Sequence, residues 1–362
     1  MNNLSDRFKF AVKFSLLALV LFFALASFNA TPVQAQDQLV FGYAAPSLAD
    51  QFQVVAQKTF VKKAEELGIK VITTDAGRDA QKQIEDIEDL IARGVDAICT
   101  VPANSKAVSV AVQQANKQNV PVFTIDRGVT EGKVVMTVLA RNYLAGVQNG
   151  EVAVRLLQGK YDGTIEGKVL HITGKTGQNV TQLRKNGFDS VVKEYPNIEM
   201  ITKAGDWSPE TGFNVVQDVL SSNPNLDIIY HHSDLYIPGT IEAIRSVKGS
   251  YPKVGEEGHI FLLSIDGASA MLEKIGQGLA DGTAVQPVTS YGEIIVPFMK
   301  EYVEEGESAL PEPGSLIKEE GAPWSPARVE ETQHGLEVAL STSYADSHNA
   351  GNNYFWGNRE SK

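Results

Sequence analysis

The sequence predicts an α/β fold with two similar lobes, each a doubly wound, Rossmann-like parallel sheet with helices on its faces. Short β-rich runs alternate with segments whose apolar residues recur at helical spacing, which is typical of this architecture. The pattern occurs twice, because Gly94–Ile98 and Asn225–Ile229 occupy corresponding places in the two halves. No low-complexity linker separates the halves, so we expect a hinge of several short crossovers between the lobes.

In the first half, strand and helix signals alternate from residue 39 onward. Asp79 can cap a helix, and Gly94 can end it. Between them Ile84, Ile87 and Leu90 recur at helical spacing and predict one apolar face. The expected strands are 39–44, 69–75, 95–102 and 121–126, and the expected helices are 54–67, 79–94 and 106–117.

The second half repeats the alternation from residue 168 onward. Its strand signals are KVLHITG, MITKAG, LDIIYHHSD and HIFLLSIDG, and a helical segment lies between each pair. We expect residues 36–140 plus about 288–318 to form an N-terminal lobe. Residues 141–287 plus about 319–362 are expected to form a C-terminal lobe with an extended tail.

The first 35 residues predict a cleaved secretory signal peptide. Basic residues precede the apolar run Phe14–Phe28, and Val33-Gln34-Ala35 is a small-residue cleavage pattern. The run has 15 residues, which is shorter than the roughly 20 that a transmembrane helix needs, so an uncleaved anchor is the weaker alternative. We therefore expect export across the inner membrane to the periplasm, with no lipid anchor, because no cysteine follows the run.

Charge and cysteine content narrow the class of protein. The chain has 32 basic and 44 acidic residues, a net charge of −12, which argues against a nucleic-acid partner. Cleavage after Ala35 removes three basic residues and one acidic residue and leaves 29 − 43 = −14. Cys99 is the single cysteine, so it forms no intrachain disulfide, and we expect a buried, small apolar side chain.

Polar side chains follow the predicted strands at their carboxyl ends, where open α/β sheets bind ligands. Asp and Arg offer paired acceptors and donors for vicinal hydroxyls, and aromatic rings suit the C–H face of a sugar. The alternative for Asp126 and Arg127 is that they cap the following turn or pair across it. The candidate ligand-binding residues are Phe52, Asp126, Arg127, Arg184, Trp207, Ser233, Asp234, Asp266 and Gln286.

Several motifs occur in one order along the chain: QIEDIEDLIARGVDAI, PVFTIDR, RKNGF, LDIIYHHSD, and SIDG followed by GTAVQ. With them the sequence resembles the sugar-type periplasmic substrate-binding proteins of ABC transporters, the ribose, galactose and autoinducer group. The resemblance covers roughly residues 38–319. It implies that Phe52 and Trp207 sandwich a sugar ring. It also implies that the sugar hydroxyls bind Asp126, Arg127, Arg184, Ser233, Asp266 and Gln286.

The sequence departs from the family pattern at positions that affect specificity. Val101 stands where ribose binders have asparagine, Ser233 is shorter than the usual asparagine, and Arg141 precedes Asn142 where Asp-Asn is common. The identity of the sugar is therefore open. From about Gly321, the chain extends beyond the usual end of the family, and the sequence assigns no role to this tail.

Other sites are disfavoured. Gly174-Lys175-Thr176 resembles the end of a P-loop, but Val169 stands where that motif needs glycine. His231 and His232 are adjacent on a strand and point to opposite faces, so they cannot chelate one metal. The spacing of calcium loops, serine-hydrolase turns and catalytic triads is missing from the sequence. We expect no cofactor, no metal and no catalytic residue.

The resemblance implies a solute-binding protein that closes two lobes around a monosaccharide or related polyol and delivers it to an ABC importer. The expected partners are the permease subunits, with a chemoreceptor as an additional one, and we expect a monomer. The first alternative is a sensory protein that binds a sugar-like signal and feeds a chemoreceptor or histidine kinase. A secreted carbohydrate-processing enzyme would need two carboxylates across a glycosidic bond. A repressor with the same core would need a DNA-binding helix-turn-helix where the apolar run stands.

Overall fold

The computed structural model describes residues 38–359. The predicted signal peptide at residues 1–35 lies outside the described residues. Among residues 38–359, no helix has both the length and the apolar character that crossing a membrane requires.

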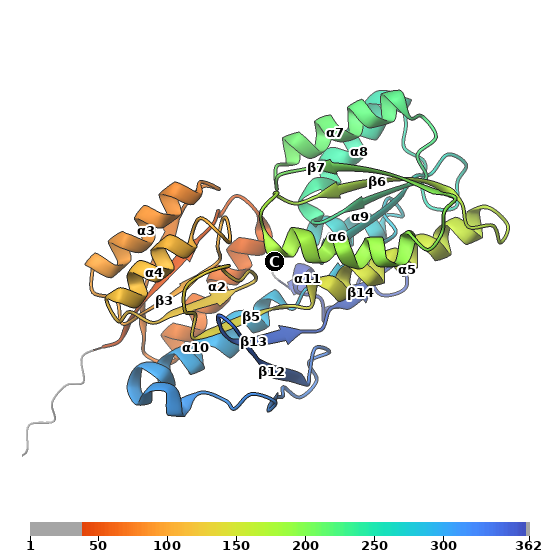
Figure 1. Cartoon of the computed structure of the whole chain (residues 1–362). Coiled ribbons are helices and arrows are strands. Elements are labelled where there is room, and N and C mark those ends of the chain that lie inside the picture. Colours follow the sequence, from red (N-terminus) through yellow and green to blue (C-terminus); the bar gives the residue numbers. More distant parts are fainter. Residues whose placement is uncertain (1–37, 360–362) are drawn as a thin grey trace, which may run out of the picture. The chain divides into compact units, whose positions relative to one another are not determined.

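The first sheet has eight strands in the order β11-β12-β13-β5-β4-β3-β1-β2 (Figure 1). Strands β1 to β5 and β13 run parallel, while β11 and β12 are antiparallel to their neighbours. The strands are β1 (Val40–Ala45), β2 (Lys70–Asp75), β3 (Ala97–Thr100), β4 (Val122–Ile125), β5 (Met136–Ala140), β11 (Leu316–Ile317), β12 (Ala327–Thr332) and β13 (Gly335–Leu340). The associated helices are α2 (Gln51–Glu66), α3 (Ala80–Ala92), α4 (Ser109–Lys117) and α10 (Val288–Glu305), followed by the short η2 (Gly306–Ala309).

The second sheet has six strands in the order β14-β10-β9-β8-β6-β7, and only β14 is antiparallel. Its strands are β6 (Gly167–Thr173), β7 (Ile198–Ala204), β8 (Ile228–His231), β9 (Phe261–Asp266), β10 (Gly282–Val285) and β14 (Ser343–Ala345). Its helices are α5 (Asn142–Lys160), α6 (Asn179–Val192), α7 (Pro209–Ser222), α8 (Ile237–Lys248) and α9 (Ser269–Gly276), with the short η1 (Asp234–Tyr236) and the C-terminal α11 (Trp356–Arg359). The predicted fold class, two mostly parallel α/β sheets, is confirmed.

Helices cover both faces of each sheet because the strands are apolar on both sides. In the first sheet, Phe41 and Phe123 pack in the cluster that contains α2 and α10, whereas Ile98 and Val122 pack with α3 and α4. Cys99 is fully buried in the first of these clusters, as predicted. In the second sheet, Val169 and its neighbours pack with α5 and α6, and the opposite face packs with α7, α8 and α9.

The boundaries of α3 follow from its sequence. The Asp79 carboxylate accepts hydrogen bonds from the backbone N–H groups of Gln81 and Lys82, at 2.8 and 3.2 Å. Gly94 follows the helix with φ of 71°, a left-handed conformation that glycine adopts without strain. Both predicted helix signals are therefore confirmed.

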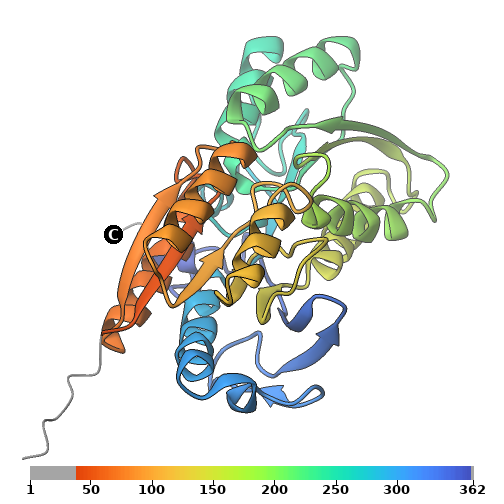
Figure 2. The same cartoon turned by 60° about the vertical axis from the view of Figure 1, so that its left-hand side comes forward.

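Three crossovers join the two sheets, as the predicted hinge requires. The chain passes from β5 into α5, from β10 into α10, and from β13 into β14 (Figures 1 and 2). The Arg141 N–H donates to the Leu340 carbonyl over 2.8 Å, so two of these crossovers are hydrogen-bonded to each other.

The predicted assignment of residues 319–362 to the C-terminal lobe is wrong for strands β12 and β13, whereas β14 and α11 pack with the second sheet. Strands β12 and β13 form an antiparallel hairpin, and β13 pairs in parallel with β5 of the first sheet. The hairpin buries Val329 and Val338 completely, which extends the first core beyond β5. Only β14 joins the second sheet, as an antiparallel neighbour of β10.

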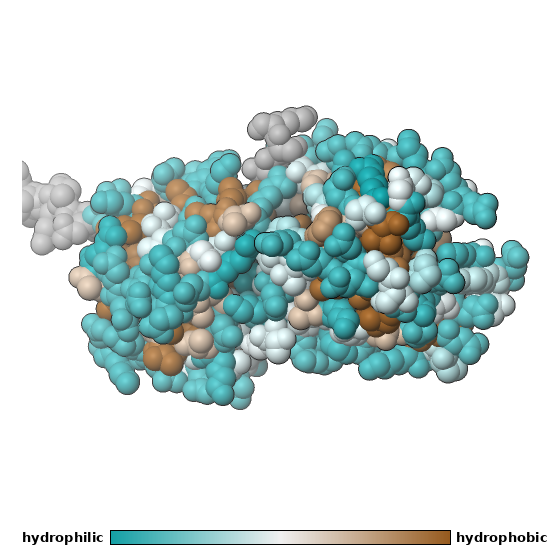
Figure 3. All heavy atoms as spheres, turned by 90° about the horizontal axis from the view of Figure 1, so that it is seen from above, coloured by the Kyte–Doolittle hydropathy of each residue, from teal (hydrophilic) through white to brown (hydrophobic). Residues whose placement is uncertain are grey.

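The surface is mainly hydrophilic on the face shown in Figure 3, where hydrophobic residues form small separate groups. Isolated exposed apolar residues are normal in soluble domains. The large exposed side chains Val110 and Tyr143 lie on α4 and α5, and Val254 lies in the loop between α8 and β9.

Candidate functional site

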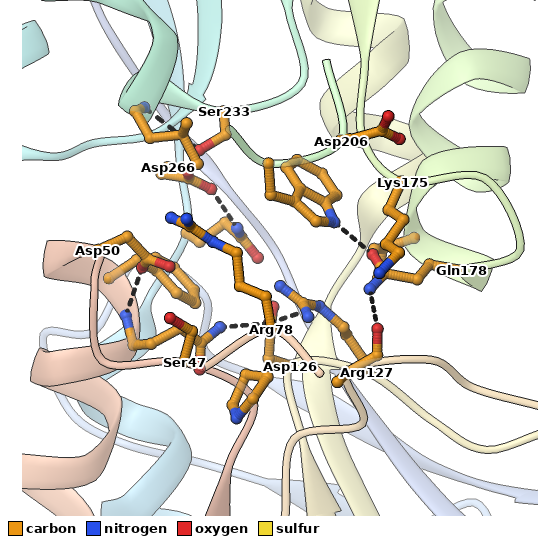
Figure 4. A pocket seen from close by; sticks show the side chains of 18 of the residues that line it. Ser47, Asp50, Arg78, Asp126, Arg127, Lys175, Gln178, Asp206, Ser233 and Asp266 are labelled. Atoms are coloured by element: carbon orange, nitrogen blue, oxygen red, sulfur yellow. Dashed lines mark hydrogen bonds and ion pairs between the residues drawn. The ribbon is translucent and has the colours of Figure 1, made fainter. Parts of the chain in front are cut away.

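A pocket lies between the carboxyl ends of the strands of the two sheets (Figure 4), and we call this pocket the cleft. The first sheet and its helices contribute Pro46, Ser47, Asp50, Phe52, Gln53, Arg78, Ala103, Asp126 and Arg127. The second contributes Lys175, Gln178, Val180, Arg184, Asp206, Trp207, Ser233, Leu235 and Asp266, and Gln286 lies on the crossover from β10 to α10. The cleft thus collects eight of the nine predicted ligand-binding residues from both halves of the chain.

Asp126 follows β4 and offers one carboxylate oxygen to the cleft. Its Oδ2 accepts a hydrogen bond from Gln53 Nε2 at 3.0 Å and pairs with Arg127 Nε at 3.2 Å. Among the described residues, no donor bonds to Oδ1, which leaves that oxygen for a ligand hydroxyl. The side chain is almost fully buried, and its φ of 63° is unusual for a residue other than glycine. Backbone strain at such a buried carboxylate is typical of functional sites.

Asp266 ends β9 and faces the cleft from the second lobe. Gln286 Nε2 donates to its Oδ1 at 2.6 Å, Ser233 Oγ donates to its Oδ2, and Arg184 lies 3.7 Å from Oδ1. Burial raises the pKa of this carboxyl group above its ordinary value, although the Arg184 guanidinium opposes the shift. Asp266 is therefore a polarised acceptor with several fixed donors around it.

Two guanidinium groups flank the ring of Trp207. The Arg127 and Arg184 guanidinium carbons lie 5.6 and 5.9 Å from the ring centroid, within the range of cation–π contacts. Arg184 is held by Asn142, whose Oδ1 accepts from its Nε at 2.7 Å, and by the His232 carbonyl. The indole N–H of Trp207 donates to Gln178 Oε1 at 2.5 Å. These contacts fix the ring beside the polar groups of the cleft.

The Gly174-Lys175-Thr176 turn has a structural reason for its glycine. A Cβ atom at Gly174 would lie 1.9 Å from the Trp207 ring, so only glycine allows the ring to pack there. The turn leads from β6 into α6, the helix that carries Arg184, and Lys175 lines the cleft. The local sequence that resembles a P-loop thus brings the backbone close to Trp207.

Phe52 lies in the first turn of α2 and lines the cleft with its ring almost buried. Its neighbours are Tyr291 and Trp356, with ring centroids 6.4 and 6.0 Å away in edge-on geometry. Such edge-on pairs are favourable aromatic contacts that restrict ring orientation. Phe52 therefore presents an apolar surface of fixed position to the cleft.

Asp234 is the one predicted ligand residue that does not line the cleft. Its Oδ2 accepts from the backbone N–H groups of Gly267 and Ala268, at 2.7 and 2.6 Å. Its Oδ1 accepts from Thr283 Oγ1 at 2.9 Å. The Asp234 carboxylate is fully engaged in holding the loop that follows Asp266.

Several cleft residues were not predicted from the sequence. Gln53 is the next residue to Phe52 on α2, and Asp50 is the N-cap of that helix. Arg78 lies in the loop after β2, with φ of 72°, and Gln178 follows the Gly174 turn. Their positions at strand ends could have suggested them, but glutamine and arginine in surface loops are too common to be distinctive.

Hydrogen bonds already join the lobes across the cleft. Gln178 Nε2 donates to the Ala103 carbonyl of the first lobe at 2.6 Å, while its Oε1 accepts from Trp207. Away from the cleft residues, Ser269 donates its N–H and its hydroxyl to Gln51 Oε1, at 3.2 and 2.8 Å. The two lobes are therefore in direct polar contact.

The charges of the cleft are balanced. Figure 4 shows Asp50, Asp126, Asp206 and Asp266 around the same space as Arg78, Arg127 and Lys175, and Arg184 completes four acids and four bases. Balanced carboxylates and guanidinium groups suit a neutral ligand that both donates and accepts hydrogen bonds. Among residues 38–359, no cluster of three or more histidine, cysteine or carboxylate residues is arranged to hold a metal ion.

The buried histidines at the end of β8 contact different partners. His232 Nε2 lies 2.9 Å from His171 Nε2, whereas His231 Nε2 lies 2.8 Å from Thr240 Oγ1. The two adjacent imidazoles thus bond to separate partners on β6 and α8 and do not share a ligand position.

Comparison of the sequence with known proteins finds transport proteins. The chain is 33% identical to the ribose import binding protein of Bacillus subtilis over 225 residues, 62% of this chain and 71% of that protein. It is 26% identical to the D-apiose import binding protein of Actinobacillus succinogenes over 292 residues, 80% of this chain and 89% of that protein.

Solved structures share the fold. A galactofuranose binding protein has a TM-score of 0.73 at 23% identity, with coverage of 87% of this chain and 97% of that chain. The Caulobacter myo-inositol binding protein has a TM-score of 0.69 at 20% identity, covering 86% of this chain and 94% of that chain.

The model of the periplasmic binding protein domain matches residues 41–308, well over half of the chain. This stretch contains all the candidate ligand residues and both sheets apart from strands β11 to β14. The chain belongs to the periplasmic binding protein domain family.

Proposed function

We propose that this protein binds a monosaccharide or a related polyol in the cleft and delivers it to an ABC importer. The observation that carries the proposal is the pair Asp126 and Asp266, which present buried carboxylates from opposite lobes to one cleft. Two guanidinium groups and two aromatic rings complete the set of contacts that a sugar uses. Relatives named as ribose and D-apiose import binding proteins support the same class of ligand.

In this proposal the cleft residues contact different parts of the ligand. Phe52 and Trp207 contact the C–H faces of the ring, while Asp126, Asp266 and Gln286 accept from or donate to its hydroxyls. Arg127, Arg184 and Ser233 complete the polar contacts. Binding would favour the closed arrangement of the lobes, since a ligand shifts the population toward the state that it contacts best. Gln53 and Arg78 join the predicted set because they line the same cleft.

Export to the periplasm is part of the proposal. The basic start, the apolar run and Val33-Gln34-Ala35 favour cleavage after Ala35, so the mature protein would begin at Gln36. N-terminal sequencing of the native protein tests this expectation. Recovery of an intact Met1 would contradict it.

The proposed partners are the membrane subunits of the importer, and we propose that the protein acts as a monomer without catalytic activity. The curated relatives described above are import binding proteins, which supports transport over a sensory role. Co-purification of the protein with a permease would test the proposed partner. A chemoreceptor recovered in the same experiment would be a second partner. Turnover of oligosaccharides would contradict the absence of catalysis.

A thermal-shift screen against pentoses, hexoses, deoxysugars and polyols tests the ligand class. Calorimetry with the best ligand should then show that Asp126→Ala and Asp266→Ala each weaken binding at least tenfold. Each change removes charge-assisted hydrogen bonds of about 1.5–3 kcal/mol. Near wild-type affinity in both variants would mean that the cleft is not the binding site.

ATP serves as the negative ligand in the same screen. Because the Gly174 turn lacks the upstream glycine of a P-loop, ATP should produce no stabilisation. Specific micromolar binding of ATP would show that the turn holds a phosphate.

A further inference from the structure

The C-terminal tail, to which the sequence assigns no role, returns to the back of the cleft. Its last described element, α11, carries Trp356, which is 2% exposed although it lies close to the end of the chain. The indole N–H donates to the Asp266 carbonyl over 2.8 Å. The same ring packs edge-on against Phe52, with centroids 6.0 Å apart. One residue of the tail therefore touches two residues that line the cleft, one from each lobe.

The backbone at Asp266 needs external support. Its φ is 133°, in a region that non-glycine residues rarely adopt, and Gly267 follows with φ of 84°. The Asp266 carbonyl accepts two hydrogen bonds, one from the Gln286 N–H at 3.1 Å and one from Trp356 Nε1. Two donors on one carbonyl fix the orientation of the peptide plane that follows Asp266, and so restrain the backbone from which its side chain projects.

The tail also packs closely against the next residues of this loop. A Cβ atom at Gly357 would lie 2.3 Å from the Gly267 carbonyl oxygen and 2.7 Å from the Ser269 nitrogen. From the other side, the Asp234 carboxylate binds the N–H groups of Gly267 and Ala268. The loop is thus clamped between a buried carboxylate of its own lobe and the C-terminal tail.

We propose that Trp356 is a positioning residue for ligand binding, which holds Asp266 and Phe52 in the geometry that the ligand needs without lining the cleft itself. This inference rests on the proposed function of the cleft. It makes the tail beyond β14 part of the binding machinery. The tail therefore does more than extend the sheets, because its last helix contacts both Phe52 and Asp266.

Trp356→Phe is the first test, because it keeps an aromatic ring near Phe52 and removes the N–H donor to Asp266. We expect affinity for the best sugar of the screen to fall roughly fivefold, as the loss of one buried hydrogen bond predicts. Trp324→Phe is the matched control, since Trp324 also lies in the tail, is 2% exposed, and donates its indole N–H to Ser290 Oγ over 2.9 Å. The control should bind with wild-type affinity, and an equal loss in both variants would overturn the inference.

A double-mutant cycle separates positioning from a general loss of stability. If Trp356 acts through the Asp266 carboxylate, Trp356→Phe should weaken binding in the wild-type background and have little further effect in the Asp266→Ala background. A loss of the same size in both backgrounds would contradict action through Asp266. Gly357→Ala provides a second variant if Trp356→Phe does not fold, because it displaces the tail from the loop and keeps the indole. We expect the same weakened binding from it.

Hydrogen exchange in the absence of sugar gives a readout that does not depend on the ligand class. Trp356→Phe should speed exchange in the peptide that contains the Gln286 amide, which shares the Asp266 carbonyl with Trp356, and in the loop 267–269. Trp324→Phe should leave both segments unchanged. If no sugar binds the wild-type protein, the proposed function fails, while exchange still decides whether Trp356 orders Asp266. Unchanged exchange in Trp356→Phe would overturn the inference even if the protein binds sugar.

Discussion

The two lobes repeat one interaction at the entry of their central strands but bury it to different depths. In the first lobe, Asp96 accepts a hydrogen bond from the Val40 N–H at 2.7 Å and is exposed. In the second, Asp227 accepts from the Lys168 N–H at 2.7 Å and is 4% exposed. Asp227 also accepts from Lys160 and from the Tyr161 hydroxyl. The same motif is a surface contact in one lobe and a buried charge network in the other.

The cores of the two lobes also differ in polarity, and the second lobe again buries more polar groups. Cys99 and Phe123 fill the inner face of the first sheet with apolar groups. The second sheet buries His171, His231 and His232 completely. Because the Gly174 N–H donates to His232 Nδ1, the proton of this imidazole resides on Nε2 and is donated to His171. The comparison teaches that one topology accepts either an apolar centre or a centre that buries three imidazoles.

The largest expected effect is a difference in unfolding free energy between variants of Asp227 and of Asp96. Asp227→Ala should cost about 2–3 kcal/mol of unfolding free energy, because it leaves a buried amide and a lysine without their acceptor. Asp96→Ala should cost about 1 kcal/mol, since water replaces the lost partner. Urea unfolding of both variants measures the difference. Equal losses would show that burial does not distinguish the two lobes.

The buried imidazoles should make the second lobe sensitive to acid. Burial lowers the pKa of His171 to about 3, so the folded state takes up fewer protons than the unfolded state below the ordinary value of 6.5. His171 therefore contributes stability above pH 6.5 that is lost as the pH falls toward 3. Relative to the wild type, His171→Gln should gain about 2 kcal/mol of unfolding free energy between pH 7 and pH 5.

Comparing the two proteins at each pH removes the contributions of shared groups such as Asp234, whose pKa is raised by burial. His334→Gln is the matched control, because His334 is only half-buried, in the turn between β12 and β13 of the first sheet. The control should follow the wild type at both pH values. If the unfolding free energy of His171→Gln changes between pH 7 and pH 5 by the same amount as that of the wild type, the proposed acid sensitivity of this core is refuted.

Ligand affinity should depend on pH through the second-lobe carboxylate. Since burial raises the pKa of Asp266 to about 6, acid between pH 7 and pH 5 protonates it and removes an acceptor for sugar hydroxyls. Affinity should fall several-fold from pH 7 to pH 5, with a limit of about tenfold per pH unit. Calorimetry on Asp266→Asn should give weaker binding with a flatter pH profile. A wild-type slope in that variant would assign the titration to another group.

The smallest effect is expected at Cys99 in the apolar core of the first lobe. Cys99→Ala should leave sugar affinity nearly unchanged, because the side chain lies in the hydrophobic cluster of β3 and does not line the cleft. Its stability should fall by roughly 1 kcal/mol, as expected for a small cavity. A tenfold loss of affinity would reveal coupling between this core and the cleft.

Local sequence determined the repeating elements and the polar strand ends. Helical spacing, the Asp79 cap and Gly94 act within a few residues, so they predict α3 without knowledge of the rest of the chain. Asp126 and Asp266 follow apolar strands, and parallel topology alone brings such ends to one edge of a sheet. These patterns were sufficient to predict the two lobes and eight of the nineteen residues that line the cleft.

Other features depend on contacts between distant parts of the chain, and only the tertiary structure decided these. Asp234 stands at a strand end like its neighbour Ser233, yet packing directs its carboxylate to the amides of Gly267 and Ala268 and away from the cleft. The hairpin of β12 and β13 joins the first sheet because its buried valines complete a core formed some 200 residues earlier in the chain. Trp356 reaches Asp266 across 90 positions of sequence, a contact that no local pattern encodes because it depends on how the three crossovers bring the tail back to the cleft.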